Sequence, residues 1–428
     1  SAISVRTHPA SLNSWPGFLC VRILYPVRSM SAALQNIRVL DMSRVLAGPW
    51  AGQLLGDYGA DVVKIERPGQ GDDTRHWGPP WLGSESAYFL STNRNKRSVT
   101  VDISTHRGQQ LVRELAGKAD VLLENFRSGT LQRYELDPAE LRRDNPGLVV
   151  CSISAFGQSG SRADQPGYDA MIQASGGLMS ITGPPDEEGG GPQKVGVAIA
   201  DIMAGMYATT AVLAALNART ITGKGQCIDV PLYDSQVAWL ANQNMNFLVG
   251  GTVPGRMGTA HPNLVPYQAF ATRDGNLMLA VGNDRQFRKC AATVGRPELS
   301  DDPRYADNAS RIENRSSLIA CLKTQLLERT TSEWLAAFAQ RGVPAGPISD
   351  IGEVLSNAHA RERKLVRRIE NAAGESVPIV SNPVDFDATP VRYEKAPPLL
   401  GEHTDEVLRE WLGYSAEMIA VLRNEDAI

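Results

Sequence analysis

The chain has 428 residues, of which 42% are hydrophobic and 21% charged, and its formal net charge is −4. These values are ordinary for a soluble globular protein, and the length is sufficient for two or three domains. Acidic and basic residues are mixed along the chain, so we expect no nucleic-acid partner. The longest apolar stretch, residues 202–216, is interrupted by glycine, tyrosine and threonine, so we expect no membrane insertion. The five cysteines show no C-x-x-C spacing, which argues against a zinc site or a disulfide framework.

The first 34 residues differ from the rest of the chain. Residues 1–40 contain no Asp or Glu, but they contain four arginines and several serines. Leaders of this composition are typical of organelle transit peptides. The pattern therefore predicts a mitochondrial leader over residues 1–34, with a disordered tail of chance composition as the alternative.

From residue 35 onward, short apolar strands alternate with helices. The patterns predict strands over 37–42, 60–65, 98–103, 119–124 and 148–155, with helices over 48–56 and 107–117 between them. Strands alternating with helices predict an α/β fold with a Rossmann-like parallel sheet that is covered on both faces.

The alternation ends near residue 200. Helices are predicted over 201–218 and 234–248, and strands over 267–272 and 276–281 are joined by the turn Arg273-Asp274-Gly275. We therefore expect the N-terminal part of a large Rossmann-like domain over 35–225, a linker helix over 226–250 and a smaller α+β domain over 251–345. A return linker and the C-terminal part of the large domain follow over 346–428.

Motifs of several common enzyme classes are absent. The sequence has no G-x-G-x-x-G after the first strand, no G-x-x-x-x-G-K-[ST], no G-x-S-x-G and no H-E-x-x-H. These absences argue against a bound dinucleotide, a P-loop, a serine hydrolase and a metal hydrolase. We expect no metal and no permanently bound cofactor, and the residues alone indicate a small-molecule transferase or isomerase.

Seven segments, in order, resemble the class III (formyl-CoA type) CoA-transferase family. They are VLDMSRVLAGP (39–49), GADVVKIERPG (59–69), NRNKRS (93–98), DVLLENF (120–126), GYDAMIQ (167–173), HPNLVPY (261–267) and PLLGEHTD (398–405). The resemblance implies a homodimer of two interlocked chains and a covalent intermediate on Asp169, with coenzyme A thioesters as substrates. An ionised carboxylate attacks a thioester without ATP, metal or a general base. From its spacing alone, Asp169 is better explained as a helix cap, and it is the resemblance that favours the catalytic role.

The same resemblance suggests residues for CoA itself. Arg67, Lys96, Asn125, Phe126 and Arg133 fall in or beside the segments that line the CoA channel. Arginine binds phosphate in a bidentate manner and lysine acts as a point charge. A solvated surface charge is the alternative for each of the three basic residues.

Two alternatives to a transferase remain open. Acyl-CoA racemases of the same superfamily use a His–Asp pair, and the histidine position is occupied here by Tyr168, while the aspartate matches Asp201. Tyrosine is a poor base near neutral pH because its reference pKa is about 10, so Asp201 is expected to cap the long helix instead. A catalytically inactive CoA-binding protein is the other alternative, which the intact Asp169 segment disfavours.

The resemblance extends to members that use succinyl-CoA and a dicarboxylic acid, which implies glutarate or hydroxymethylglutarate as acceptor. Formyl-CoA or oxalyl-CoA chemistry is the alternative within the family. A dicarboxylate needs a cation for its distal carboxylate, and Arg94, Arg256 and Arg285 are the candidates. The glycine segments 189–191 and 250–251 are candidate loops over the intermediate, and the sequence assigns a role to neither.

Overall fold

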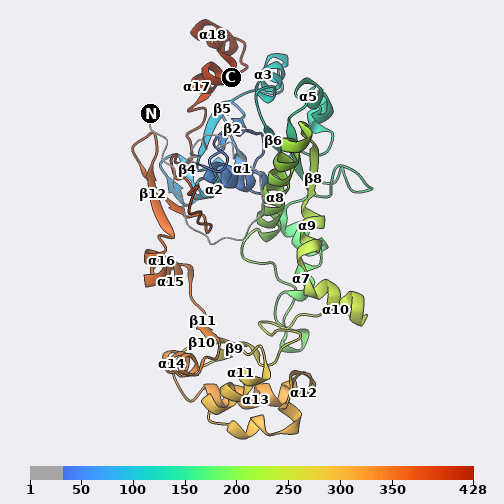
Figure 1. The fold of residues 1–428 in the computed structure, drawn as a ribbon, viewed down its shortest axis with the longest axis vertical. Coiled ribbons are helices and arrows are strands. Elements are labelled where there is room, and N and C mark those ends of the chain that lie inside the picture. The colour runs from blue at the N-terminus through green and yellow to red at the C-terminus, as the bar shows by residue number, and fades with distance from the viewer. Residues whose placement is uncertain (1–31) are drawn as a thin grey trace, which may run out of the picture.

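The computed structural model describes residues 32–428, so most of the predicted leader lies outside the described residues. Figure 1 shows a large domain and a small domain, joined by two chain segments that run on opposite sides of the molecule. The C-terminus lies on the large domain, to which the chain returns after it has formed the small domain.

The large domain is built on a six-stranded sheet in which every neighbouring pair of strands is parallel. The strand order is β5-β2-β1-β6-β7-β8. From β1 the chain moves outward in one direction to β5 and then returns to place β6 on the other side of β1. This is the doubly wound Rossmann order, and ligands of such sheets bind where the order reverses, outside the carboxyl ends of the strands. The predicted Rossmann-like architecture is confirmed. The strands are β1 (Arg38–Asp41), β2 (Asp61–Glu66), β5 (Lys96–Thr100), β6 (Val121–Glu124), β7 (Val149–Ser154) and β8 (Cys227–Pro231).

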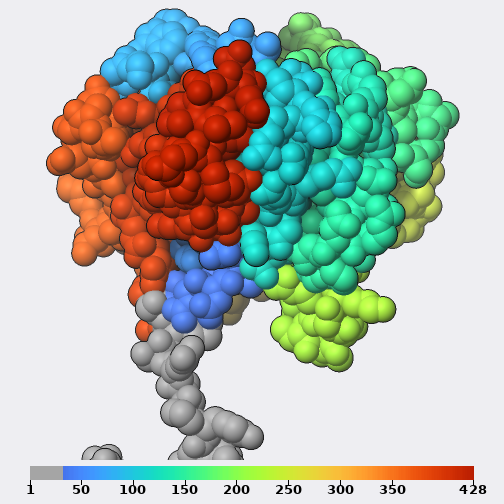
Figure 2. All heavy atoms as spheres, turned by 90° about the horizontal axis from the view of Figure 1, so that it is seen from above, coloured from blue at the N-terminus to red at the C-terminus, as the bar shows by residue number. Residues whose placement is uncertain are grey.

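Helices cover both faces of this sheet because successive strand residues point to opposite sides. Val39 faces a core formed with α1 (Ala47–Asp57), α8 (Ile199–Thr222) and α9 (Leu232–Trp239). Leu40 faces the other core, which contains α3 (His106–Ala116), α5 (Pro138–Asp144), α17 (Thr404–Leu412) and α18 (Ala416–Asn424). Figure 2 shows the C-terminal helices, in red, packed against the cyan segment that includes α3. The last residues of the chain are therefore part of the large domain.

Helix α8 is the one helix within residues 32–428 whose length and composition would allow it to cross a membrane. Small residues explain this composition, because Ala200, Ala204 and Ala208 are fully buried against the sheet and α1. Gly205 permits the close approach, since a Cβ atom at this position would lie 2.6 Å from the carbonyl oxygen of Ala47. The apolar sequence of α8 thus serves tight packing between two helices.

The small domain consists of a three-stranded antiparallel sheet, with strand order β11-β10-β9, and the four helices beside it. The predicted hairpin is confirmed, and the amide of Thr272 donates to the carbonyl oxygen of Gly275 across its turn. Trp334 and Phe338 lie in the core between the sheet and the helices. The elements are β9 (Tyr267–Ala271), β10 (Asn276–Ala280), α11 (Asp284–Thr293), α12 (Asn308–Glu313), α13 (Arg315–Leu326), α14 (Thr331–Arg341) and β11 (Ala345–Pro347).

The prediction of one helix over 234–248 is wrong. The segment forms α9 and then α10 (Asn242–Gly250), which are separated at Ala241, a residue with φ of 47°. No glycine or proline marks this break, so the sequence offered no signal for it. Gly251 ends α10 with φ of 70°, which accounts for the glycine pair at 250–251 as a helix terminus.

The remaining elements are short. A hairpin of β12 (Val366–Glu370) and β13 (Ser376–Val380) follows the return segment and packs beside α2. The others are η1 (Asp73–His76), β3 (Trp81–Leu82), β4 (Glu85–Ser86), α2 (Ala87–Thr92), α4 (Thr130–Arg133), α6 (Asp169–Ser175), α7 (Leu178–Ile181), η2 (Asp186–Glu188), η3 (Pro297–Ser300), η4 (Pro303–Tyr305), α15 (Ile351–Ser356) and α16 (Ala358–Glu362).

Candidate functional site

Two adjoining cavities open at the carboxyl ends of the strands, where the strand order reverses. The first cavity, of about 370 Å³, lies between the loops that follow β2 and β5 and the helix α4. The second cavity, of about 180 Å³, lies between the loops that follow β1 and β6 and the N-terminal ends of α6 and α8. Arg44, Asp73 and Phe126 line both cavities, so a ligand can extend from one into the other. The first is also lined by Arg67, Asp72, Ser104, Thr130 and Tyr134, and the second by Asn125, Arg127, Gly167, Tyr168 and Asp201.

The wall shared by the two cavities is fixed by backbone contacts. The Asn125 amide accepts from the backbone N–H of Arg44 at 2.8 Å and donates to its carbonyl oxygen at 2.6 Å. The next residue, Val45, has φ of 70°, which is unfavourable for a β-branched side chain. Its N–H donates to the Asp72 carboxylate at 3.3 Å. Contacts from two separate loops therefore hold this strained turn in place.

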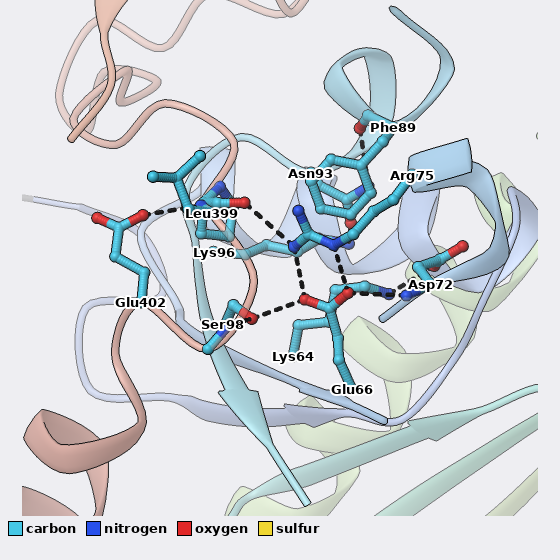
Figure 3. A network of polar contacts seen from close by, with 12 residues as sticks. Lys64, Glu66, Asp72, Arg75, Phe89, Asn93, Lys96, Ser98, Leu399 and Glu402 are labelled. Carbon is cyan, nitrogen blue, oxygen red and sulfur yellow. Dashed lines mark hydrogen bonds and ion pairs between the residues drawn. The ribbon is translucent and has the colours of Figure 1, made fainter. Parts of the chain in front are cut away.

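A buried network of charged groups lies next to the wall shared by the two cavities and contacts it through Asp72. Figure 3 shows Lys64, Glu66, Asp72, Arg75 and Lys96 close together, with Arg75 coming from η1. Lys64 forms an ion pair with Asp72 at 2.9 Å, and Arg75 donates two hydrogen bonds to Glu66, at 2.7 and 2.8 Å. Removing one partner of such a pair leaves an uncompensated buried charge, at a cost of about 3–5 kcal/mol. The network therefore fixes the loop that carries Asp72 and Asp73.

Lys96 belongs to this interior network and does not line either cavity. Its side chain is fully buried, and its ammonium group donates to Asp41, Asn93 and the carbonyl oxygen of Pro49, each at 2.9 Å. Burial lowers its pKa to about 8 despite the neighbouring Asp41. The position does not support the expected contact with CoA. The lysine of the segment 93–98 points into the protein.

The other residues expected to bind CoA are distributed unevenly. Arg67 is exposed and lines the first cavity, Asn125 lines the second, and Phe126 lies between the two. Arg133 is exposed on α4 and donates to the Thr130 hydroxyl at 3.1 Å, and it lines neither cavity. Its neighbours Thr130 and Tyr134 line the first cavity instead. Three of the five residues are therefore brought together.

Asp169 is the first residue of α6, and each of its two carboxylate oxygens accepts one hydrogen bond from the protein. One oxygen accepts from the backbone N–H of Ala200 at 2.8 Å, and the other accepts from the Gln173 side chain at 2.7 Å. Ala200 lies in the first turn of α8, whose N-cap residue, Ala198, has no side-chain oxygen. Asp169 therefore does cap a helix, but the capped helix is α8 and not its own. It does not line either cavity.

Asp201, which also lies in the first turn of α8, does line the second cavity. The expectation that it caps this helix is wrong, because no side chain caps α8 from within the helix and no group of residues 32–428 donates a hydrogen bond to Asp201. Burial, followed by the charge of Asp169, raises the pKa of Asp201 to about 7. A carboxylate with a raised pKa is more basic and more nucleophilic than an ordinary one.

A neutral phenol lies close to these two carboxylates. Burial and then the charges of Asp201 and Asp169 raise the pKa of Tyr88 to about 12, so this hydroxyl keeps its proton at neutral pH. Tyr168, at the position of the racemase histidine, lines the second cavity and is 66% exposed. No histidine lines either cavity within the described part of the chain.

The three arginines expected as candidates for a distal carboxylate lie elsewhere. Arg94 is buried and donates two hydrogen bonds to Asp57, at 2.8 and 2.6 Å, so it is not available to a substrate. Arg256 forms an ion pair with Asp186, and Arg285 is exposed on α11 of the small domain. Neither lines a cavity described above. Arg44 is the arginine that lines both cavities, and the sequence did not predict this role although Arg44 lies in the segment 39–49.

Comparison with known proteins identifies the family. The family model for CoA-transferase family III matches residues 34–404. Over 383 residues the chain is 47% identical to a succinate–glutarate CoA-transferase of Agrobacterium fabrum, covering 88% of this chain and 95% of the relative. Over 389 residues it is 41% identical to the human succinyl-CoA:glutarate CoA-transferase, covering 91% of this chain and 88% of the relative.

Solved structures show the same fold. A CaiB/BaiF family protein from Brucella suis superposes with a TM-score of 0.79 at 43% identity, covering 89% of this chain and all of that one. A protein from Mycobacterium tuberculosis superposes with a TM-score of 0.77 at 33% identity, covering 87% and 98%. The family match extends over most of the chain and includes every strand of the parallel sheet. The chain therefore belongs to CoA-transferase family III.

Proposed function

We propose that the protein transfers coenzyme A from succinyl-CoA to a dicarboxylic acid, with glutarate as the first acceptor and hydroxymethylglutarate as the second. The single observation that carries the proposal is the placement of an aspartate with a raised pKa, Asp201, in a cavity that adjoins a larger one. The acids are suggested by the names of the Agrobacterium fabrum and human relatives.

Asp201 takes the nucleophilic role in this proposal, in place of Asp169. The carboxylate of Asp201 faces the second cavity and accepts no hydrogen bond from residues 32–428, so its oxygens are free to attack. One carboxylate oxygen of Asp169 accepts from the backbone N–H of Ala200 and so holds the first turn of α8, and the other accepts from the Gln173 side chain within α6. The role of Asp169 is to position Asp201 and, through its charge, to raise the pKa of Asp201.

The reaction then proceeds without metal or ATP. The ionised Asp201 attacks the thioester carbonyl of succinyl-CoA, which gives a succinyl–aspartyl mixed anhydride and releases the CoA thiolate. The thiolate attacks the aspartyl carbonyl, which forms an aspartyl-CoA thioester and releases succinate. Glutarate attacks this thioester to form a glutaryl–aspartyl anhydride and free thiolate. The thiolate finally attacks the glutaryl carbonyl, and glutaryl-CoA and ionised Asp201 result.

The two cavities divide the substrate between them. The first has the size and the exposed cation, Arg67, for the nucleotide part of CoA, and Phe126 separates it from the acyl end. The second, at about 180 Å³, suits a small acyl group beside Asp201. An acyl group that fills this small cavity displaces water, which limits hydrolysis of the anhydride and the thioester.

The proposed assembly is a homodimer of interlocked chains. Large apolar side chains are exposed along α8, α9 and α10, and α10 projects from the large domain (Figure 1). Exposed apolar side chains on neighbouring helices are typical of a surface that a second subunit covers. The exposed residues are Met206, Tyr207, Val237, Met245, Phe247, Leu248 and Val249.

The proposed location is the mitochondrial matrix, on the strength of the acid-free, arginine-containing N-terminus. Succinyl-CoA is an expected donor in this compartment. A fusion of residues 1–34 to a fluorescent reporter should enter mitochondria, and a fusion in which the arginines are replaced by glutamine should not. A reporter that stays outside in both cases would contradict the location without affecting the proposed reaction.

An exchange assay tests the reaction itself. Succinyl-CoA is mixed with glutarate, hydroxymethylglutarate, adipate, oxalate or formate, and new acyl-CoA species are followed by mass spectrometry. Glutaryl-CoA should form without ATP, together with an equal amount of free succinate. Asp201→Asn serves as the control that should form none. If none of these acids yields a new acyl-CoA, the proposed transferase function is wrong. Incorporation of solvent deuterium at the α-carbon of a 2-methylacyl-CoA would then establish the racemase function.

A further inference from the structure

The second cavity contains a cation whose position is set by the fold and whose binding capacity is largely unused. From this we infer that Arg44 is the receptor for the distal carboxylate of the acyl group and so determines that the enzyme prefers dicarboxylic acids. The inference rests on the proposed function, because it names the residue that recognises the substrate class at the same site.

The backbone of Arg44 cannot shift without breaking several contacts. Asn125 binds both its N–H and its carbonyl oxygen, and the following residue, Val45, is held with φ of 70° by Asp72. Asp72 is in turn paired with the fully buried Lys64. A long side chain on a fixed backbone loses less conformational entropy when it binds, and a strained turn at such a point is typical of a functional site.

The guanidinium group of Arg44 lies at the junction of the two cavities. Its centre is 5.5 Å from the centroid of the Phe126 ring, and one nitrogen lies 3.3 Å from a carboxylate oxygen of Asp73. Both partners of this ion pair are about half exposed, at 49% and 55%, so solvent weakens it. Arginine has five N–H donors in a planar fork that matches a carboxylate. One donor is used, and the rest remain for a ligand.

The location of Arg44 within the cavity matches the geometry of the reaction. Arg44 and Asp201 line the same cavity of about 180 Å³. While Asp201 attacks one carbonyl of a four- or five-carbon diacid, the far carboxylate must lie within the same small space. A carboxylate left there without a cation would be strongly unfavourable. A bidentate contact from Arg44 neutralises it and also orients the reacting carbonyl.

Other cations are less suitable. Arg94 is committed to Asp57, and Lys64 is buried against Asp72. Arg127 lines the second cavity as well and is exposed, so it is the rival that the experiment must exclude. A second rival explanation is that Arg44 binds a phosphate of CoA, because it also lines the first cavity.

A competition assay with the full-length enzyme separates these explanations. Succinyl-CoA is mixed with equal amounts of glutarate and pentanoate, which has the same chain length but lacks the distal carboxylate. The ratio of glutaryl-CoA to pentanoyl-CoA is measured, and effects on the donor half-reaction cancel in this ratio. In Arg44→Gln the ratio should fall by about 10- to 100-fold, because the charge-assisted bidentate contact is lost. Arg44→Lys should give an intermediate ratio, since it keeps the charge but not the fork.

Each other outcome has a distinct meaning. If both products slow in parallel in Arg44→Gln, with the ratio unchanged or both products lost, Arg44 serves CoA binding or folding and the inference is overturned. A fall of the ratio in Arg127→Gln but not in Arg44→Gln would assign the role to Arg127. Arg285→Gln, an exposed arginine on α11, is the matched control and should leave the ratio unchanged. If the wild-type enzyme forms neither product, the proposed function itself has failed.

Discussion

Replacing Asp201 by asparagine is expected to abolish transfer and, at the same time, to make the protein more stable above neutral pH. The reason is that the pKa of Asp201 rises from 3.8 to about 7 on folding, chiefly through burial and then through Asp169. The folded protein therefore holds this proton more tightly than the unfolded chain, and stability is lost as the pH rises from about 4 through about 7. Asparagine has no charge to desolvate.

The size of the effect follows from the same difference. The difference of about 3 between the folded and unfolded pKa values of Asp201 corresponds to about 4 kcal/mol at most. Asp201 keeps some contact with solvent, which screens the charge, so the expected gain in the free energy of unfolding is about 1–2 kcal/mol at pH 8. Urea denaturation at pH 8 and at pH 5 measures it. The gain should be largest at pH 8 and about a third of that size at pH 5, because at pH 5 the carboxyl group is protonated in the folded protein but mostly ionised in the unfolded chain.

Asp169→Asn is the matched variant with the opposite sign. It weakens the hydrogen bond that caps α8 and should lower the free energy of unfolding by about 0.5–2 kcal/mol. Some transfer activity should remain, because the nucleophile is still present. A stable Asp169→Asn protein without any transfer, beside an Asp201→Asn protein with residual transfer, would refute the assignment of Asp201 and restore Asp169 as the nucleophile.

Three further predictions concern the site and its support. The kcat/KM for succinyl-CoA should rise with pH through about 7, as Asp201 ionises, and in Asp169→Asn this rise should move to lower pH because a neighbouring negative charge is gone; an unchanged profile would contradict the coupling. Phe126→Ala should raise the KM for succinyl-CoA by about 5- to 30-fold, because the ring between the two cavities is lost. Steady-state kinetics measures this KM, and an unchanged value would contradict a role of Phe126 in binding. Arg94→Leu should lower the free energy of unfolding by about 3–5 kcal/mol, because Asp57 remains buried without its ion-pair partner. The ratio of glutaryl-CoA to pentanoyl-CoA in the competition assay should stay as in the wild type, because Arg94 does not contact substrate.

The sequence alone predicted the features that depend on local patterns of residues. The alternation of short strand segments with helical segments predicted the parallel sheet, because this order is typical of a parallel sheet whose faces are covered by helices. Arg273-Asp274-Gly275 predicted its hairpin through turn chemistry alone. The family was apparent from seven segments in order, and the comparisons confirm it.

The tertiary structure decided which of these segments act at the site. An aspartate in the first turn of a helix looks the same in sequence whether it caps that helix, caps another or faces a ligand. Asp169 caps a helix whose first turn is 31 residues away in the sequence, and only the folded chain brings the two together and leaves Asp201 free in the cavity. The direction of a long side chain is decided in the same way. Lys96 points into a charged interior, and Arg44 points into the cavities because Asn125 and Asp72, from distant loops, fix its turn.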